Sequence, residues 1–254
     1  MKALVFDLRG FMAHFRTFYT NSSSVSYGFP PRTALMGIVA SILGYDRDTY
    51  YEILSPENCK LSVSLLTPVR KFIQTVNYIR TKPKNIPNGD RFNSFRGAVQ
   101  THLEREIITY QVGIEFVVPL KGELRYRVYF TTQDGKLYGK LKNLLEQGKT
   151  YYSLYMGLTE LLANFEYVGE FPINEPIEDE GVKSVIPEEY FELIDFSKPL
   201  SLLLERMPYH FKMEGNFRKL SKIKKFIYER SCKEIPLIDY SGVISINGEN
   251  VIWM

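Results

Sequence analysis

The stretch YGFPPRTALMGIVASILG, residues 27–44, decides how the first part of the chain folds. Pro30 and Pro31 fix two successive φ angles, so the chain must arrive extended and can turn helical only from about Pro31 or Arg32. Apolar residues then recur at the spacing of one helix face: Leu35, Ile38, Val39 and Ile42. Gly44 supplies a C-terminal stop. The stretch therefore predicts a rigid loop followed by a packed helix.

The start of this predicted helix is also a candidate anion site. Free backbone N–H groups and the positive end of the helix dipole lie there, beside Arg32 and just after Tyr27. We expect Arg16, Tyr27 and Arg32 to converge at this end and to hold a phosphate or a base. The alternative, in which Arg32 only caps a solvated helix start, stays open from the sequence.

The residues around this stretch carry a family resemblance. Residues 2–9, KALVFDLR, predict a strand, and GFMAHFR at residues 10–16 and a Thr/Ser-rich link follow it. With residues 27–44 they resemble the opening of the fifth CRISPR-associated (Cas) protein family, in the RAMP superfamily, and most closely its type I-B branch. Residues 151–171 resemble the family's glycine loop and following strand, and residues 242–254 resemble its terminal hairpin. The resemblance thus covers the full length.

The resemblance implies a fold and a set of partners. It implies a ferredoxin-like (RRM-like) α+β domain with a β-rich C-terminal part, at the foot of a Cascade effector complex in antiviral defence. The chain would hold the 5′ handle of the crRNA, contact the backbone subunit and the large subunit, and meet target DNA only indirectly. In the glycine loop, Tyr155, Met156 and Gly157 would face the RNA, with Gly157 allowing close approach of a ligand or another strand. The alternative, in which Gly157 belongs to an ordinary tight turn, stays open. The resemblance implies no cofactor.

The charge of the chain is unevenly distributed. The net charge is +3 over 254 residues, but residues 70–105 alone carry +6. This segment interleaves basic residues with Phe72, Tyr78, Phe92 and Phe95, the combination that binds single-stranded nucleic acid. The basic residues that we expect to bind RNA are Arg80, Lys82, Lys84, Arg91 and Arg96.

Prolines and glycines interrupt this basic segment, so the pattern beyond Pro68 predicts a long loop. A solvated loop without function is one interpretation. The family resemblance implies the other, a thumb-like hairpin insertion at about residues 70–106 that contacts the crRNA and the neighbouring backbone subunit.

The remaining pattern predicts a ferredoxin-like order of strand, helix, two strands, helix and strand. The further elements are a short helix at 46–54, strands at 59–66, 107–118 and 124–131, a helix from 137 to about 148, and a strand at 165–171. In the strand at 124–131, the face with Arg125, Arg127 and Tyr129 is left open to solvent or RNA. An acidic stretch at 174–183 divides a first domain, 1–173, from a β-rich subdomain, 174–254.

The subdomain contains a basic aromatic strand at 222–230 and a closing hairpin turning at Asn247-Gly248. Asp7 and Arg9 interrupt the first apolar run, so no signal peptide is expected, and no segment is long and apolar enough to span a bilayer. We therefore expect a cytoplasmic protein without membrane contact, whose two cysteines, Cys59 and Cys232, are buried thiols.

Two functions from different classes remain open. The favoured one is a non-catalytic RNA-binding assembly subunit, and the alternative is a metal-independent endoribonuclease that processes CRISPR repeat RNA. Cleavage needs a base and an acid, but the three histidines, His14, His102 and His210, are scattered, and the Tyr, Lys and His set of type I-C relatives cannot be aligned. A small-molecule enzyme lacks support because no metal-ligand cluster, phosphate loop or nucleophile motif is present.

Overall fold

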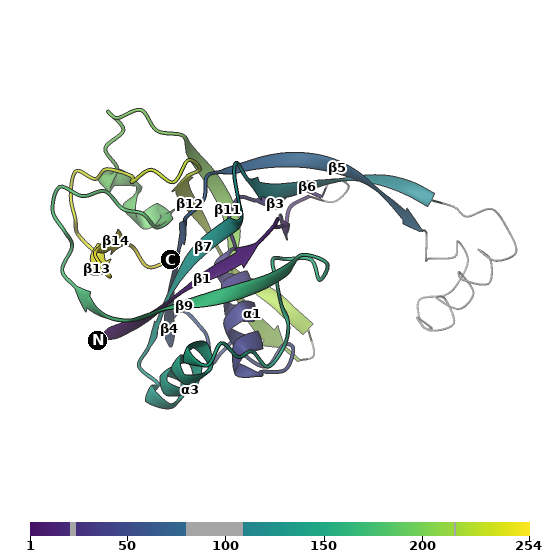
Figure 1. The fold of residues 1–254 in the computed structure, drawn as a ribbon, viewed down its shortest axis with the longest axis horizontal. Helices are drawn as coiled ribbons and strands as arrows, with labels where there is room; N and C mark the ends of the chain where they lie inside the picture. The colour runs from purple at the N-terminus through teal and green to yellow at the C-terminus, as the bar shows by residue number, and fades with distance from the viewer. Residues whose placement is uncertain (21–23, 80–108, 216) are drawn as a thin grey trace, which may run out of the picture.

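The computed structural model describes residues 1–20, 24–79, 109–215 and 217–254, and it shows a mixed α/β fold dominated by strands (Figure 1). The first part contains β1 (Lys2–Gly10), β2 (Phe15–Arg16), β3 (Ser26–Tyr27), α1 (Arg32–Leu43), β4 (Cys59–Leu65), β5 (Val69–Ile79), β6 (Thr109–Pro119), β7 (Leu124–Thr132), α3 (Gly135–Glu146), β8 (Leu154–Tyr155) and β9 (Leu162–Asn174). The C-terminal part contains β10 (Ile186–Pro187), η1 (Glu188–Leu193), β11 (Leu202–Glu214), β12 (Phe217–Glu229), β13 (Ile244–Ile246) and β14 (Glu249–Val251). None of the helices in the described ranges has the length and apolar character that a membrane span needs.

The main sheet is antiparallel and has β1 near its centre. Its strand path is β14-β13-β9-β1-β7-β4, with β8 paired to β9. Phe6 on β1 lies opposite Val128 on β7 and Tyr167 on β9. Helix α1 follows β3 in the chain and leads to β4, and α3 connects β7 to β8 and β9. The two helices are therefore the crossovers that allow four central strands to pair out of chain order.

The predicted first helix is confirmed. Pro31 is extended, with ψ 157°, and its carbonyl accepts the N–H groups of Ala34 and Leu35. At the other end, Gly44 takes the left-handed conformation with φ +80°. A glycine fits there because a Cβ would meet the ring of Tyr151. Local sequence thus sets both ends of α1.

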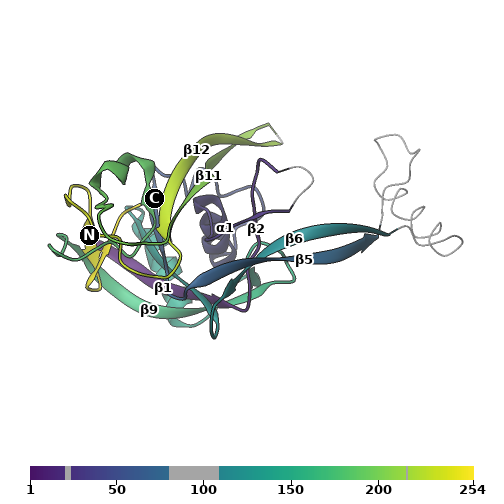
Figure 2. The same cartoon turned by 90° about the horizontal axis from the view of Figure 1, so that it is seen from above.

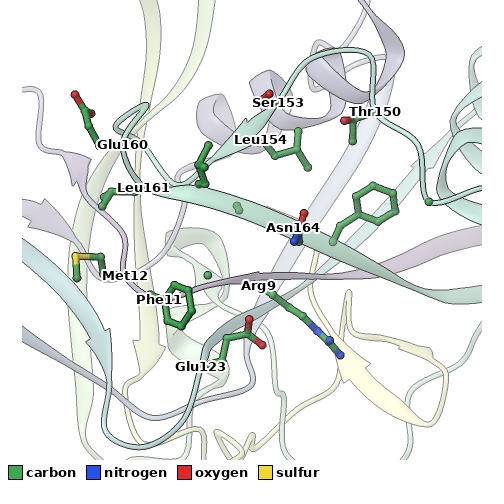
Figure 3. A pocket seen from close by; sticks show the side chains of 15 residues that line it. Arg9, Phe11, Met12, Glu123, Thr150, Ser153, Leu154, Glu160, Leu161 and Asn164 are labelled. Carbon is green, nitrogen blue, oxygen red and sulfur yellow. The ribbon is translucent and has the colours of Figure 1, made fainter.

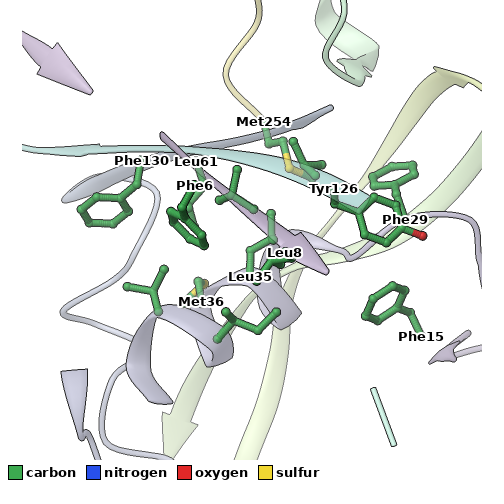
Figure 4. Packing of buried hydrophobic residues seen from close by; sticks show 14 of the residues in the cluster. Phe6, Leu8, Phe15, Phe29, Leu35, Met36, Leu61, Tyr126, Phe130 and Met254 are labelled. Atoms are coloured by element: carbon green, nitrogen blue, oxygen red, sulfur yellow. The ribbon is translucent and has the colours of Figure 1, made fainter. Parts of the chain in front are cut away.

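The apolar face of α1 packs on the sheet (Figure 4). Leu35 and Met36 on the helix and Phe6 on β1 are fully buried in one core cluster. The same cluster includes C-terminal side chains from β11, β12 and the chain end: Met207, Tyr209, Phe226, Tyr228 and Met254. The C-terminal part therefore shares the core of the first part, and the predicted division at residues 173 and 174 stays a prediction.

The predicted helix at 46–54 is wrong, because this segment forms turns. Asp48 has φ +66°, a conformation that a helix interior does not permit. Its carboxylate accepts a hydrogen bond from the Tyr51 hydroxyl at 2.5 Å, which holds the turn. A short-range side-chain bond has thus replaced helical backbone bonding.

The chain after Pro68 is a strand where the sequence predicted a loop. β5 pairs with β6 along its full length, from Val69 opposite Pro119 to Ile79 opposite Thr109. The two strands form a ribbon that projects from the main body (Figure 1). Among the described side chains of β5, Val69 is buried and the others are half-buried or exposed, so little burial imposes alternation on this strand and its sequence carries little strand signal. Residues 80–106 of the predicted insertion lie outside the described residues.

The C-terminal part adds a second sheet and a hairpin. The second sheet has the order β10-β12-β11, and β11 and β12 form a long hairpin. β13 and β14 form the predicted closing hairpin, whose Asn247 and Gly248 both have positive φ, at 55° and 73°. β13 then pairs with β9 and joins the main sheet. Of the two predicted buried thiols, Cys59 is buried and Cys232 half-buried; both are free.

The face of β7 that the sequence left open to solvent or RNA is filled by an ion network. Arg127 Nε donates to Asp7 Oδ1 at 2.9 Å, and its Nη1 lies 3.1 Å from Glu249 Oε2. Tyr129, which is fully buried, donates its hydroxyl to Glu249 Oε2 at 2.7 Å. Arg125 pairs with Asp7 and with Glu166. The arginines of this face are therefore neutralised within the protein.

Replacing Glu249 with Gln should destabilise the protein in a pH-dependent way. Burial alone raises the pKa of Glu249, but the Tyr129 hydrogen bond and the charge of Arg127 outweigh it and hold the pKa below its ordinary value. A lowered carboxyl pKa stabilises the fold above about pH 4.3, and this contribution is lost as pH falls through the folded-state pKa. Glu249→Gln should lower the free energy of unfolding by roughly 1 to 3 kcal/mol at pH 7.

Urea denaturation between pH 3 and pH 7 measures this effect, with Glu175→Gln, at an exposed position, as the control. The gap between Glu249→Gln and wild type should close toward acid pH. A gap that is constant with pH would contradict an ionised Glu249 in the network.

Candidate functional site

Two adjoining hollows run along the exposed side of α1, with volumes of about 690 and 470 Å³. We call them together the α1 groove. The two hollows share six of their lining residues: Phe15, Thr33, Ala34, Tyr50, Gly157 and Arg218. The walls come from the β2–β3 link, the turns after α1, the β5–β6 ribbon, the loop around β8 and the β11–β12 hairpin. The groove therefore lies where five separate parts of the chain meet.

The floor of the groove is a track of small side chains on α1. Thr33, Gly37 and Ser41 follow one another at intervals of four residues, which places them on one helix face. The Ser41 hydroxyl donates to the Gly37 carbonyl at 2.8 Å, so it lies flat along the helix. Another backbone reaches the end of this track, where the Tyr152 N–H donates to the Ser41 carbonyl at 3.1 Å. The small side chains keep the groove open above the helix.

The walls of the groove carry arginines and aromatic rings. Its arginines are Arg16, Arg47 and Arg218, and its exposed or half-buried aromatic residues include Phe18, Tyr50, Tyr78, Tyr152, Tyr155 and Phe211. None of the described residues that line the groove is acidic. A cleft lined by charge of one sign attracts ligands of the other sign. The groove is thus suited to an extended anion that carries planar groups.

Arg218 is held in a fixed position on its wall. Its guanidinium lies over the Phe211 ring, 4.8 Å from the centroid, and Nη1 donates to the Tyr51 hydroxyl at 3.2 Å. The hydrogen bond with Tyr51 raises the pKa of Arg218. Asp48 pairs with Arg47 at 3.3 Å and lies 4.0 Å from Arg218 Nη1, but Arg47 is 87% exposed and Arg218 47%, so solvent and salt screen both ion pairs. The remaining donors of a cation fixed in this way can receive a phosphate with little further ordering.

The structure does not bring Arg32 to the groove, contrary to the sequence prediction. Arg32 is only 1% exposed, and its guanidinium donates to the carbonyls of Leu54 and Cys59 at 3.1 and 2.9 Å. It also lies over the Tyr209 ring, 5.3 Å from the centroid. Burial lowers the pKa of Arg32, although an arginine stays charged at any ordinary pH. Arg32 is committed to internal bonds.

Tyr27 is also buried, and its hydroxyl donates to the Arg206 carbonyl at 2.8 Å. Arg16, in contrast, is exposed and lines the groove. The predicted convergence of Arg16, Tyr27 and Arg32 at one phosphate is therefore wrong. Neither the pairing of β2 with β3 nor the turn that takes up Arg32 could be read from local pattern.

The predicted glycine-loop residues have three different environments. Tyr155 is 42% exposed and lines the groove. Met156 is fully buried, next to Gly10. Gly157 lines the groove but has φ +97°, and a Cβ there would overlap the carbonyl oxygen of His14. Gly157 is thus required by the approach of another backbone segment.

His14 connects several parts of the groove, a role that no local sequence pattern indicates. Its Nδ1 lies 2.7 Å from the Glu115 carbonyl, which can only accept, so Nδ1 carries the proton. Nε2 then accepts from the Ser24 hydroxyl at 3.0 Å. The backbone N–H of His14 donates to the Met156 carbonyl at 3.0 Å. His14 thereby ties the base of β6 to the β2–β3 link and the glycine loop.

A Tyr, His and Lys set does come together on the β11–β12 hairpin. His210 lies opposite Lys222, and Lys222 Nζ is 5.5 Å from the centroid of the Tyr209 ring. However, Tyr209 and His210 are both buried, and the Tyr209 hydroxyl donates to the Met254 carbonyl at 3.1 Å. Burial also lowers the pKa of His210. These groups are not presented to a substrate of the size of RNA.

The predicted RNA-binding residues of the basic segment, Arg80, Lys82, Lys84, Arg91 and Arg96, lie outside the described residues, as does His102. The described part of this insertion is the β5–β6 ribbon. Tyr78, near the end of β5, lines one end of the groove. In the sequence, these basic residues stand between the end of β5 at Ile79 and the start of β6 at Thr109.

A larger hollow of about 830 Å³ lies at the end of β1, between β9 and the loop after α3 (Figure 3). Phe11 and Leu162 stand at its edge, 81% and 67% exposed. Its one arginine, Arg9, is paired with Glu166, and the lining includes Glu123 and Glu160. This mixture of acids and apolar groups makes the hollow a poor site for a polyanion.

Comparisons with known proteins identify a family and a shared fold. The model of the family described as CRISPR-associated protein (Cas_Cas5) matches residues 3–223. The chain is similar to one in the solved structure of a CRISPR RNA-guided surveillance complex, with a TM-score of 0.50, 14% sequence identity, and coverage of 92% of this chain and 91% of that chain. It is also similar to a CRISPR protein from Archaeoglobus fulgidus, with a TM-score of 0.50, 13% identity and 98% coverage of both chains. No curated protein sequence matches the chain.

Replacing Arg32 with Ala should destabilise the whole fold. The substitution leaves two buried carbonyls, of Leu54 and Cys59, without their donor, and it removes the cation from the Tyr209 ring. We expect a loss of roughly 2 to 5 kcal/mol in the free energy of unfolding, measured by urea denaturation. Arg47→Ala is the control because that side chain is 87% exposed, and it should cost less than about 0.5 kcal/mol. Equal stability of the two variants would show that the Arg32 bonds are dispensable.

Proposed function

The chain belongs to the CRISPR-associated Cas_Cas5 family, and we propose that it is the subunit of a type I Cascade effector complex that binds and caps the 5′ handle of crRNA in the α1 groove. The observation that carries the proposal is the lining of the groove. Arginines and aromatic rings from five parts of the chain meet there, and none of the described lining residues is acidic.

The lining matches the chemistry of single-stranded RNA. Phosphates pair with cations, and splayed bases stack on aromatic or guanidinium planes. Arg16 stands on the β2–β3 wall and Arg218 on the hairpin wall, so a strand along α1 would pass between two cations. Tyr155 would offer its exposed ring to a base from the third wall. The small floor residues would let the backbone of the RNA approach the helix.

The proposal includes a non-catalytic role. Both ring nitrogens of His14 are occupied by internal bonds, and His210 is buried, so neither is placed to take a 2′-OH proton in the groove. The alternative of a metal-independent endoribonuclease would need a different set of residues. His102 lies outside the described residues and stays a candidate of that alternative.

We further propose the finer assignments that the family suggests. The path β9-β1-β7-β4, with α1 and α3 as the crossovers, supports a ferredoxin-like domain. The type I-B subtype, and the backbone subunit and the large subunit as partners, rest on the family motif and on the β5–β6 ribbon as a contact arm. Target DNA would be met indirectly, through the complex.

Replacing Arg16 and Arg218 together with Gln should weaken binding of handle-bearing RNA. A charge-assisted hydrogen bond contributes roughly 1.5 to 3 kcal/mol, so the loss of one such bond lowers affinity by about ten- to 150-fold. Fluorescence anisotropy with a labelled handle RNA measures this effect. Tyr155→Ala should weaken binding separately, by roughly 1 to 3 kcal/mol, if its ring stacks on a base.

The matched control is Lys60→Gln with Lys149→Gln, two exposed lysines outside the groove, which makes the same change in net charge. Both double variants should keep the thermal midpoint of the wild type within a few degrees. If the groove variant binds the RNA as well as the lysine control does, the groove is not the handle site.

Incubation with repeat RNA in EDTA separates the subunit from the nuclease. A handle-binding subunit leaves the RNA intact while it shifts the RNA in a native gel. A parallel preparation of His102→Ala is the control. If the wild type cleaves the RNA specifically in EDTA and the variant does not, the protein is the endoribonuclease and the proposed non-catalytic role is wrong.

A further inference from the structure

The β11–β12 hairpin carries a row of exposed cations on its outer face. We define the outer face as the side opposite Met207, Tyr209 and Phe211, which pack on the core. Its basic residues are Arg206, Lys212, Lys219 and Lys225, and all four are exposed. Seen from above, α1 lies between this hairpin and the β5–β6 ribbon (Figure 2). The hairpin is thus a second projecting element with a surface of its own.

The register places these cations directly against one another. Arg206 lies opposite Lys225, and Lys212 lies opposite Lys219. Directly opposed residues of an antiparallel pair share a face with Cβ atoms about 5 Å apart, and like charges in this position are destabilising. Two such pairs on one hairpin work against the stability of the free protein. A ligand that brings negative charge would relieve both.

Internal acids do little to neutralise this face. Lys219 Nζ lies 2.8 Å from Glu214, but the two side chains are 64% and 62% exposed, so solvent and salt screen the pair. Among the described residues, neither Lys212 nor Lys225 makes an ion pair. Arg206 lies over the ring of Phe18, a groove residue, 5.7 Å from the centroid, so it stands at the edge of the outer face that is nearest the groove. The face therefore keeps most of its positive charge.

We propose that the outer face of the β11–β12 hairpin binds the phosphodiester backbone of a nucleic acid other than the strand in the α1 groove. The two cation pairs are six residues apart on each strand, roughly 20 Å at about 3.3 Å per residue. This length covers about six phosphates of a B-form strand at 3.4 Å each. An acidic protein would offer only scattered carboxylates, whereas a backbone supplies charge at every step.

The surface differs from the groove in its chemistry. The groove mixes arginines with aromatic rings, which suits splayed bases, whereas on β12 Ile223 stands between Lys219 and Lys225 of the outer face. Phe217, which is 80% exposed, lies at the tip of the hairpin, beyond the two cation pairs. Between the pairs, the cations contact phosphates and do not read bases. Binding at the outer face is therefore insensitive to sequence and strongly dependent on salt, and it extends the protein beyond the proposed handle site.

The test replaces Lys212, Lys219 and Lys225 together with Gln in the full-length chain. The probes are a 30-base-pair DNA duplex of arbitrary sequence, a single strand of the same DNA and the handle RNA. For the duplex, the slope of log K against log salt should flatten by up to about 2.7 units, at about 0.9 per phosphate contact. Affinity at about 0.1 M salt should fall at least tenfold, while handle RNA binding stays within about twofold. If the variant loses binding of the single-stranded DNA and keeps binding of the duplex, the same surface is supported and its ligand is identified as single-stranded.

Two control variants keep the outcome interpretable. Replacing the same three lysines with Arg should retain binding, which shows that the loss follows charge and not misfolding. Replacing Lys60, Lys136 and Lys149 with Gln makes the same change in net charge at exposed positions elsewhere and should have little effect. If the hairpin variant binds both DNA probes as this control does, the proposal fails. It also fails if handle RNA binding falls in parallel, or if only assembly with a protein subunit is lost.

Discussion

The buried guanidinium of Arg32 is the interaction on which the shape of this protein depends. It stands at the first turn of α1 and bonds the carbonyls of Leu54 and Cys59, so the end of the turn segment and the start of β4 are fixed to the helix. On its other side the ring of Tyr209 brings in the β11–β12 hairpin. One charge thus sets the helix, the sheet edge and the hairpin relative to one another. A buried cation is costly to desolvate, and its hydrogen bonds and the Tyr209 ring offset that cost.

The groove follows from this arrangement. Because α1 is held at both ends, its small-residue face stays exposed between walls that come from distant parts of the chain. His14 fixes the opposite wall, where it ties Glu115, Ser24 and Met156 together through bonds of 2.7 to 3.0 Å. The residues that shape the site are therefore buried and internally bonded, and those that would meet a ligand stand on the surface they create. This separation explains how Arg32 and Arg16 can both belong to the entry motif and have different roles.

The sequence predicted what local chemistry controls. Two prolines and Gly44 set the limits of α1, and Asn247-Gly248 set the closing turn, because each acts through its own backbone angles. The sequence did not predict the turns around Asp48, because the bond from Tyr51 competes with helix formation there. It did not predict the strand β5 either, because the described side chains of β5 beyond Val69 are half-buried or exposed and leave no alternating pattern. At the site, Arg16, Tyr155 and Gly157 line the groove, and their contact with RNA stays a prediction. Arg32, Tyr27 and Met156 are buried, because burial is decided by segments that are remote in the sequence.

The role of a basic residue, like its burial, depends on segments that are remote in the sequence. β7 and β12 are both rich in basic and apolar residues, and their sequences alone do not separate a structural face from a binding face. On β7, the neighbours in the sheet supply Asp7, and a hairpin from the chain end supplies Glu249, so the arginines are neutralised. On the outer face of β12, the neighbouring strand supplies Arg206 and Lys212, and the charge is reinforced. Strand order therefore decides which cations stabilise the fold and which remain for a ligand. The role of a basic strand can be inferred only once the residues of its neighbouring strands are known.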